Sequence, residues 1–252
     1  MMGGIVRAGL ARPENCLASD VKSEARDAFS AATGVEAAQD NLEVLRRCDV
    51  ILLAVKPQNM AEVLAGLKSG AEARHLFVSI AAGIRTVFIE KALGASARVV
   101  CVMPNTPALL GCGAAGVAPG RQATPGDTAL TLKLMNAVGS AVEIAESQMD
   151  AVTALSGSGP AYFFRFVEHL IEAGVEQGLP VKVAEKLAKQ TILGAARMLT
   201  ERPETPAQLR AAVTSPGGTT EAALKVFDAG GLGALVSRAI KAAADQGREL
   251  GR

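Results

Sequence analysis

The chain has 252 residues, a formal net charge of +1, 49% hydrophobic residues and only 3% aromatic residues. A nearly neutral chain with one tyrosine and no tryptophan has neither the basic surface nor the stacking platform of a nucleic-acid-binding protein. No apolar run reaches about 18 residues, so no membrane span is expected.

The cysteine pattern indicates a reducing compartment without a metal site. The four cysteines are scattered, and no histidine lies at ligand spacing from any of them. Cys48 and Cys101 lie within or beside apolar runs, where a thiol acts as a small hydrophobic group. We therefore expect free thiols, a cytoplasmic location and no bound metal. His75 and His169 have no nearby Ser or Cys partner for a hydrolase site, so we expect surface or structural roles.

From residue 14 to about 145, short apolar runs typical of strands alternate with helical segments. The unbroken apolar run at 49–55 is typical of a strand that is buried on both faces. The other expected strands are 16–18, 76–81, 98–103 and 141–145, and the expected helices are 22–32, 42–47, 59–67, 86–93 and 125–138, with a glycine-rich segment at 111–120. This alternation predicts a parallel sheet with helices on both faces, which binds ligands at the carboxyl ends of its strands.

After about residue 147 the pattern becomes helical throughout. Apolar residues recur at helical spacing in the segments 150–155, 161–177, 181–199, 206–213, 220–229 and 232–250. Gly157, Gly159 and Pro160 predict a break between the first two segments. We therefore expect an α/β domain at residues 1–147 and an all-helical domain at 148–252.

Small or rigid residues follow three successive strands. They are AVKP at 54–57, AAG at 81–83 and PNTP at 104–107. One such sequence is an ordinary turn, but three in successive strand–helix units indicate a flat ligand against the backbone. A dinucleotide across the carboxyl edge of the sheet accounts for all three.

The glycine loop GxGxxG of a dinucleotide site is not found before the first expected strand. The chain opens on MGGIVRAGL, typical of the helix after such a loop, with Gly3 as the candidate for its last glycine. Asp20 follows Ser19 at a strand end, near the position that contacts the ribose, and Lys22 and Arg26 are candidates for a 2′-phosphate. An Asp-x-Lys sequence is also a common helix start, so both interpretations stay open.

The sequence TSPGGTT at 214–220 places a glycine turn directly before a helix. Pro216 fixes one backbone dihedral angle, and the two glycines after it allow backbone N–H groups to converge. Convergent N–H groups at a helix N-terminus favour an anion. Taken alone, the turn is more typical of an ordinary interhelical connection with a capping threonine.

Five segments together resemble the pyrroline-5-carboxylate reductase family. They are VILLAVKPQ (50–58), VSIAAG (78–83), VVCVMPNTP (99–107), LSGSGPAY (155–162) and LRAAVTSPGGTTEAALKVFD (209–228), in the family's order and at its spacing. The resemblance implies an α/β Rossmann-type dinucleotide-binding domain and an all-α dimerisation domain, with the active site at the interface of a homodimer or larger homo-oligomer. It also implies hydride transfer from NADPH, or from NADH, to 1-pyrroline-5-carboxylate, which yields L-proline in the last step of proline biosynthesis.

The same resemblance implies a role for individual residues. Thr220 would be catalytic through a hydrogen bond to the ring nitrogen of the substrate. The substrate carboxylate would be bound at the glycine turn by Ser215, Gly217, Gly218 and Thr219, with Glu204 nearby on a looser alignment. The cofactor would be bound mainly at strand ends, by Gly3, Ser19, Asp20, Asn41, Ala54, Val55, Lys56, Pro57, Ala81, Ala82 and Asn105.

Two departures from the family pattern stand out. Cys101 occupies a position where many members carry arginine, so that charge is absent or supplied by another residue. The strand that should precede the glycine loop lies in mid-sheet in this topology, and without it two strand edges would be unpaired, at about 1–3 kcal/mol per buried backbone group. We therefore expect an N-terminally shortened chain. Equal, tight NADPH binding by this chain and one extended by upstream codons would contradict that expectation.

Two other functions remain alternatives on the sequence. A truncated, catalytically silent oligomerising homologue would fold and assemble without oxidising NADPH. A related imine or β-hydroxyacid reductase is less favoured, because the β-hydroxyacid enzymes need a catalytic lysine in the helical domain. Lys182, Lys186 and Lys189 are instead typical of one solvated helix face.

Overall fold

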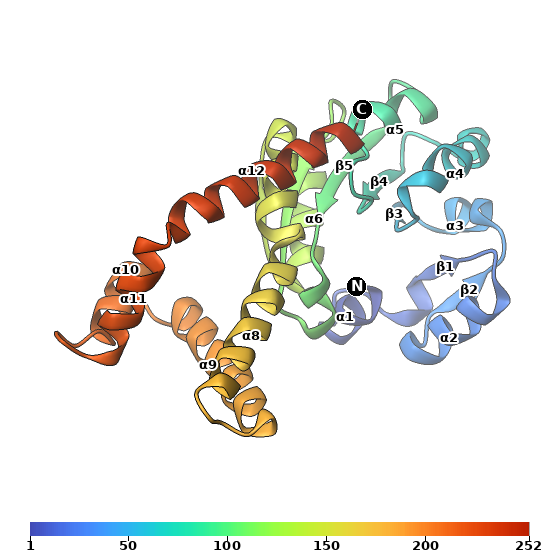
Figure 1. Cartoon of the computed structure of the whole chain (residues 1–252). Helices are drawn as coiled ribbons and strands as arrows, with labels where there is room; N and C mark the ends of the chain where they lie inside the picture. Colours follow the sequence, from blue (N-terminus) through green and yellow to red (C-terminus); the bar gives the residue numbers. More distant parts are fainter. Residues whose placement is uncertain (252) are drawn as a thin grey trace. The chain divides into compact units, whose positions relative to one another are not determined.

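Strands and helices alternate through the first part of the chain, as the hydrophobic pattern predicts (Figure 1). The computed structural model describes residues 1–251. Its strands here are β1 (Leu17–Ser19), β2 (Glu36–Ala38), β3 (Val50–Leu53), β4 (Leu76–Ser79), β5 (Arg98–Met103), β6 (Gly113–Pro119) and β7 (Gly139–Glu143). Its helices here are α1 (Met2–Arg7), α2 (Ser23–Thr33), α3 (Asn41–Arg47), α4 (Met60–Leu67), α5 (Thr86–Leu93) and α6 (Pro125–Asn136).

The strands form two sheets. β1 and β2 pair in parallel, and the other five form a sheet in the order β3-β4-β5-β6-β7. Among residues 1–251, β1 therefore pairs only with β2, and β3 pairs only with β4. The expectation of two unpaired strand edges is confirmed.

Two of these strands are absent from the sequence-based prediction, and one pairing is antiparallel. β2 was not expected, and β6 lies in the segment expected to be only glycine-rich. β6 runs antiparallel to β5 and parallel to β7, so the expectation of a wholly parallel sheet is wrong at this pair. Only glycine fits at position 113 because the chain packs closely there. A Cβ would lie 2.8 Å from the Ala108 Cβ and 3.0 Å from the Val138 carbonyl oxygen.

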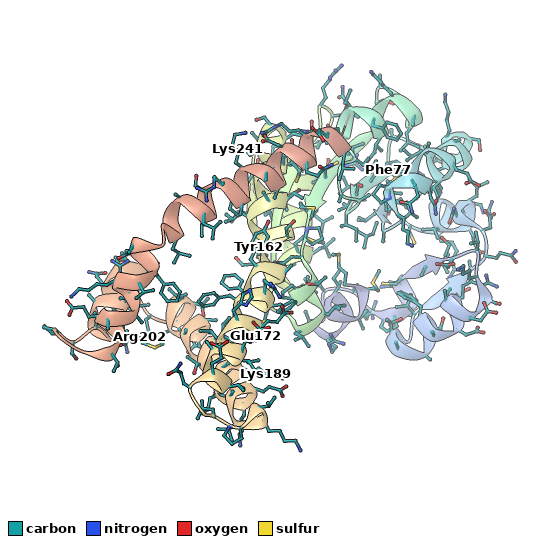
Figure 2. The ribbon with its side chains drawn as sticks, viewed as in Figure 1. Phe77, Tyr162, Glu172, Lys189, Arg202 and Lys241 are labelled. Carbon is teal, nitrogen blue, oxygen red and sulfur yellow. The ribbon has the colours of Figure 1, made fainter. Side chains whose placement is uncertain are left out.

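The core covers both faces of the five-stranded sheet. On one face, Phe77 (labelled in Figure 2) packs with buried residues of α4 and α5, among them Leu64 and Ile89. On the other face, Val78 packs with Met135 of α6. Burial on both faces explains why these strands read as continuous apolar runs.

Gly139, the first residue of β7, lies in very close contact with the backbone of β6. Its φ is +157°, and a Cβ there would lie 2.0 Å from the Gly113 carbonyl oxygen. Replacement of Gly139 by alanine is therefore expected to lower the free energy of unfolding by about 2–4 kcal/mol in urea denaturation. The matched control is Gly66→Ala in α4, where a Cβ would have no atom within 4 Å beyond its chain neighbours and the backbone of its own helix. There the free energy of unfolding is expected to increase by about 0.5–1 kcal/mol. Equal effects of the two substitutions would contradict this account.

The second part of the chain is helical, as expected. After α7 (Met149–Val152), a π-helical turn at Thr153–Gly157 leads into the helices α8 (Gly159–Glu176), α9 (Val181–Glu201), α10 (Pro206–Ala212), α11 (Thr219–Ala229) and α12 (Leu232–Leu250). At the expected break, Gly157 allows close packing, because a Cβ there would lie 2.6 Å from the Met103 Cε.

Contacts divide the chain into two units whose bounds differ from the expected boundary after residue 147. The first unit contains residues 1–158 and 242–251, and the second contains residues 159–241. Residues 148–158 and the end of α12 belong to the first unit because they pack against its α/β part. Asp150 forms an ion pair with Arg85, and Gly247 of α12 lies against Asp150.

Candidate active site

The structure places the predicted strand-end residues along one edge of the five-stranded sheet. β3, β4 and β5 are mutually parallel, so their carboxyl ends lie on the same side. The segment 54–57 directly follows β3, while the segment 81–82 and Asn105 begin two residues after the ends of β4 and β5. Ala54 and Ala82 are exposed, and small exposed residues leave the backbone open to a flat ligand.

Predicted cofactor residues also meet at the end of β1. The Ser19 hydroxyl donates a hydrogen bond to the Asn41 Oδ1 at 2.7 Å. One Asp20 carboxylate oxygen accepts the backbone N–H of Lys22 at 2.8 Å, and the Asp20 carbonyl accepts the Arg26 guanidinium at 2.8 Å. The exposed Asp20 carboxylate can accept a ribose hydroxyl, and the cations Lys22 and Arg26 can bind a 2′-phosphate.

Gly3 and Asn105, two other predicted cofactor residues, have surroundings that the sequence does not reveal. Gly3 lies in the first turn of α1, but the close approach of this helix occurs at Gly4, where a Cβ would lie 2.3 Å from the Val138 Cγ1. The Asn105 amide donates to the Ser156 carbonyl at 3.0 Å and accepts the Ala114 N–H at 2.9 Å. Asn105 therefore ties the end of β5 to β6 and to the π-helical turn.

Cys101 lies in β5, two residues before the end of that strand, and is buried. Burial raises the pKa of its thiol to about 12; the negative charges of Glu146 and Glu90 add to this shift and the charge of Arg85 opposes it. A neutral thiol therefore stands where many family members carry arginine. The positive charge of Arg85, on the loop after β4, lies close enough to this thiol to lower its pKa.

The glycine turn of the second unit lies directly before α11. Gly217 has a φ of +71°, which favours glycine, and Gly218 is the N-cap residue of the helix. The Gly217 N–H donates to the Glu221 carboxylate at 2.9 Å, and the Gly218 N–H donates to the Ser215 carbonyl at 3.0 Å. Groups of the chain itself thus accept both N–H groups. The binding of a substrate carboxylate at this turn stays a prediction.

Glu221 is a residue that sequence reasoning missed. Its carboxylate also lies 3.3 Å from the Lys225 Nζ. An acidic residue in the first turn of a helix was the available signal, since it complements the helix dipole. Thr220 is half-buried in the same turn, and its hydroxyl has no hydrogen-bond partner among residues 1–251.

Glu204 is paired with Arg202 (labelled in Figure 2), whose guanidinium lies 3.0 Å from its carboxylate. Hydrogen bonds from Arg202 hold the pKa of Glu204 below its ordinary value.

The remaining polar side chains noted in the sequence have structural or surface roles. His75 is buried, accepting the Glu72 N–H at Nδ1 and contacting the Leu45 carbonyl through Nε2, each at 2.9 Å. Lys189 is exposed and pairs with Glu185.

The described residues 1–251 contain no group of three His, Cys, Asp or Glu side chains that could hold a metal ion. Over the same residues, no helix is long and apolar enough to cross a membrane.

The fold and the two sets of residues define a class: a Rossmann-type α/β oxidoreductase with an appended helical region. A family model described as pyrroline-5-carboxylate reductase dimerisation matches residues 146–250, and one described as NADP oxidoreductase coenzyme F420-dependent matches residues 1–83. The pyrroline-5-carboxylate reductase of Methanosarcina acetivorans is 42% identical over 252 residues, covering 100% of this chain and 93% of that protein. The chain belongs to the pyrroline-5-carboxylate reductase family.

Solved structures agree with this assignment. A pyrroline-5-carboxylate reductase from Coxiella burnetii superposes with a TM-score of 0.95 at 38% identity, covering 100% of this chain and 93% of that one. The Plasmodium falciparum enzyme, solved with NADP bound, superposes with a TM-score of 0.86 at 31% identity and the same coverage.

Proposed function

We propose that this chain reduces 1-pyrroline-5-carboxylate to L-proline with NADPH, the last step of proline biosynthesis, and accepts NADH as a weaker donor. One observation carries the proposal: all 252 residues of the chain match a pyrroline-5-carboxylate reductase. The glycine turn before α11 agrees with it. The NADP-bound relative and the matching NADP oxidoreductase family model support the cofactor.

The strand-end residues fit a nicotinamide dinucleotide, which supplies the hydride when bound. Asp20 would bind the ribose, while Ser19 and Asn41, which share a hydrogen bond, would shape that end of the site. Segments 54–57 and 81–82 would lie along the cofactor, with Asn105 near the nicotinamide. The small side chains of Ala54, Ala81 and Ala82 allow close approach, and the buried core beneath them holds the loops in place.

The glycine turn would bind the substrate carboxylate. The backbone N–H groups of Gly217, Gly218 and Thr219, with the Ser215 hydroxyl, form the anion site, and Glu221 releases the Gly217 N–H when the carboxylate enters. Lys225 at 3.3 Å provides Glu221 with an alternative partner. The Thr220 hydroxyl then donates to or accepts from the ring nitrogen, the atom that becomes the amine of proline.

Steady-state NADPH oxidation with 1-pyrroline-5-carboxylate tests the proposal. The proposal predicts turnover that depends on both substrates and yields proline. A folded, oligomeric chain without turnover would support the silent homologue instead.

Lys22 provides a test of the preference for NADPH. Replacement by serine keeps the backbone N–H that Asp20 accepts but removes a cation beside the expected 2′-phosphate. The KM for NADPH is expected to rise about five- to tenfold, while the KM for NADH, which lacks that phosphate, changes less than about twofold. Initial rates with both cofactors provide the measurement. Equal changes for the two would contradict the assignment.

The second unit supports a homodimer or larger homo-oligomer. Within residues 159–241, only Gly159 and Ala184 are buried, while large apolar side chains are exposed on α8, α9 and α11. Examples are Phe163, Phe164, Leu187, Leu199 and Val226. Apolar patches of this kind mark a surface that another molecule covers. A second copy of the chain is the proposed partner, because the dimerisation family model matches this region.

The proposed location is the cytoplasm. Cys112 is exposed and all four cysteines carry free thiols. An exposed thiol persists in a reducing compartment.

A further inference from the structure

An ion pair that the proposed chemistry does not use lies next to Ala81 and Ala82, two of the proposed cofactor residues. The Arg85 guanidinium is 2.7 Å from the Asp150 carboxylate, and the two side chains are 29% and 11% exposed. The same guanidinium donates to the Glu146 carbonyl at 3.2 Å. The Glu146 carboxylate accepts the Thr86 N–H, the first of α5, at 2.6 Å. Three bonds therefore tie the loop after β4 to the segment 146–150, which is about 60 residues away in the sequence.

The end of α12 lies over the same loop. A Cβ on Gly247 would lie 3.6 Å from the Asp150 Oδ1, and one on Gly251 would lie 3.8 Å from the Arg85 Nε. The two backbones meet at Gly83, whose φ is +76° and where a Cβ would lie 3.5 Å from the Leu250 carbonyl oxygen. Figure 1 shows the end of α12 beside α5. A cation at the carboxyl end of a helix is favourable, because the carbonyl groups there carry partial negative charge.

We infer that Arg85 is a positioning residue for the cofactor. It holds the loop 81–83 between Asp150 and the end of α12, in the conformation that the cofactor meets, and touches neither cofactor nor substrate. This inference rests on the proposed function, which places Ala81 and Ala82 at the nicotinamide. A loop that is already ordered binds its ligand more tightly than one that must be ordered on binding. Loss of Arg85 therefore weakens cofactor binding, whereas the glycine turn, which belongs to the other unit, is unaffected.

The chain contains a matched control for this pair. Arg98 lies 2.8 Å from Asp127, with side chains that are 28% and 8% exposed, so its chemistry and burial are nearly those of Arg85 and Asp150. Arg98 is the first residue of β5, at the sheet edge opposite the cofactor loops. A purely structural role for both pairs predicts equal consequences when either arginine is lost.

The experiment compares Arg85→Gln with Arg98→Gln in the full chain. Fluorescence titration with NADPH gives the Kd, steady-state kinetics give both KM values, and thermal unfolding gives the Tm. We expect similar losses of Tm, but a Kd and a KM for NADPH raised about tenfold or more only in Arg85→Gln, with the KM for 1-pyrroline-5-carboxylate within about twofold. Arg85→Lys, which keeps the charge, should recover most of the affinity and covers the case in which Arg85→Gln does not fold.

Each outcome decides a different claim. Equal NADPH affinity in Arg85→Gln and Arg98→Gln, or no recovery in Arg85→Lys, would overturn the positioning role. A wild-type chain that neither binds NADPH nor turns over would overturn the proposed function itself, whatever the variants do.

Discussion

Replacement of Thr220 by alanine is expected to lower kcat for 1-pyrroline-5-carboxylate reduction by about 100-fold or more, while the Kd for NADPH changes less than about twofold. The hydroxyl is the one side-chain group at the start of α11 that is half-buried and has no hydrogen-bond partner among residues 1–251. A group that meets the ring nitrogen only during reaction acts on kcat rather than on cofactor binding. Steady-state kinetics and NADPH titration measure the two quantities separately.

Two variants control this result. Thr220→Ser keeps the hydroxyl and should retain kcat within about tenfold. Thr200→Ala removes a hydroxyl that is bonded to the Ala196 carbonyl within α9, and should leave kcat unchanged. Unchanged turnover in Thr220→Ala would remove Thr220 from the reaction. A parallel loss in Thr200→Ala would show that the effect reports general destabilisation of the helices.

Replacement of Phe164 by glutamate is expected to convert the homo-oligomer to monomer and to abolish most activity. Phe164 on α8 is 64% exposed within its own chain. Burial of such a side chain contributes about 2 kcal/mol, and a two-fold symmetric interface contains it twice, so the dimer dissociation constant should rise by about 1,000-fold. Light scattering and sedimentation measure the mass across a range of concentrations.

Lys189→Gln is the control for this substitution. Lys189, labelled in Figure 2, is also exposed on the helical unit but pairs with Glu185 on a polar face, so its loss should leave the mass unchanged. An unchanged mass in Phe164→Glu would place the interface on another face. A monomeric wild-type chain would contradict the proposed oligomer.

Periodicity and turn residues predicted the elements whose signals are local. The strand at 49–55 could be predicted because burial on both faces requires an unbroken apolar run, although β3 itself spans Val50–Leu53. β6 could not be predicted, because its glycines and alanines are selected by tight packing between β5 and β7 and so carry no alternating hydrophobic pattern.

The site was predictable where it follows strand ends and less so where residues distant in sequence meet. The carboxyl edge of the sheet follows from the order of strands and helices, so the segments 54–57 and 81–82 could be assigned to it. The pair of Arg85 with Asp150 could not, because it joins residues 65 positions apart with no motif linking them. Glu221 carried a weak signal, since acidic residues are common in a first helical turn for capping alone.

The most direct test of the central claim follows the hydride. NADPH deuterated at both hydrogen positions on C4 of the nicotinamide is incubated with 1-pyrroline-5-carboxylate and this chain, and the proline is analysed by mass spectrometry and NMR. The account predicts L-proline with one deuterium on the carbon that was double-bonded to nitrogen, and about 100-fold less of it when Thr220→Ala replaces the wild-type chain over the same short interval. Proline without deuterium, or NADPH consumption without proline, would contradict it.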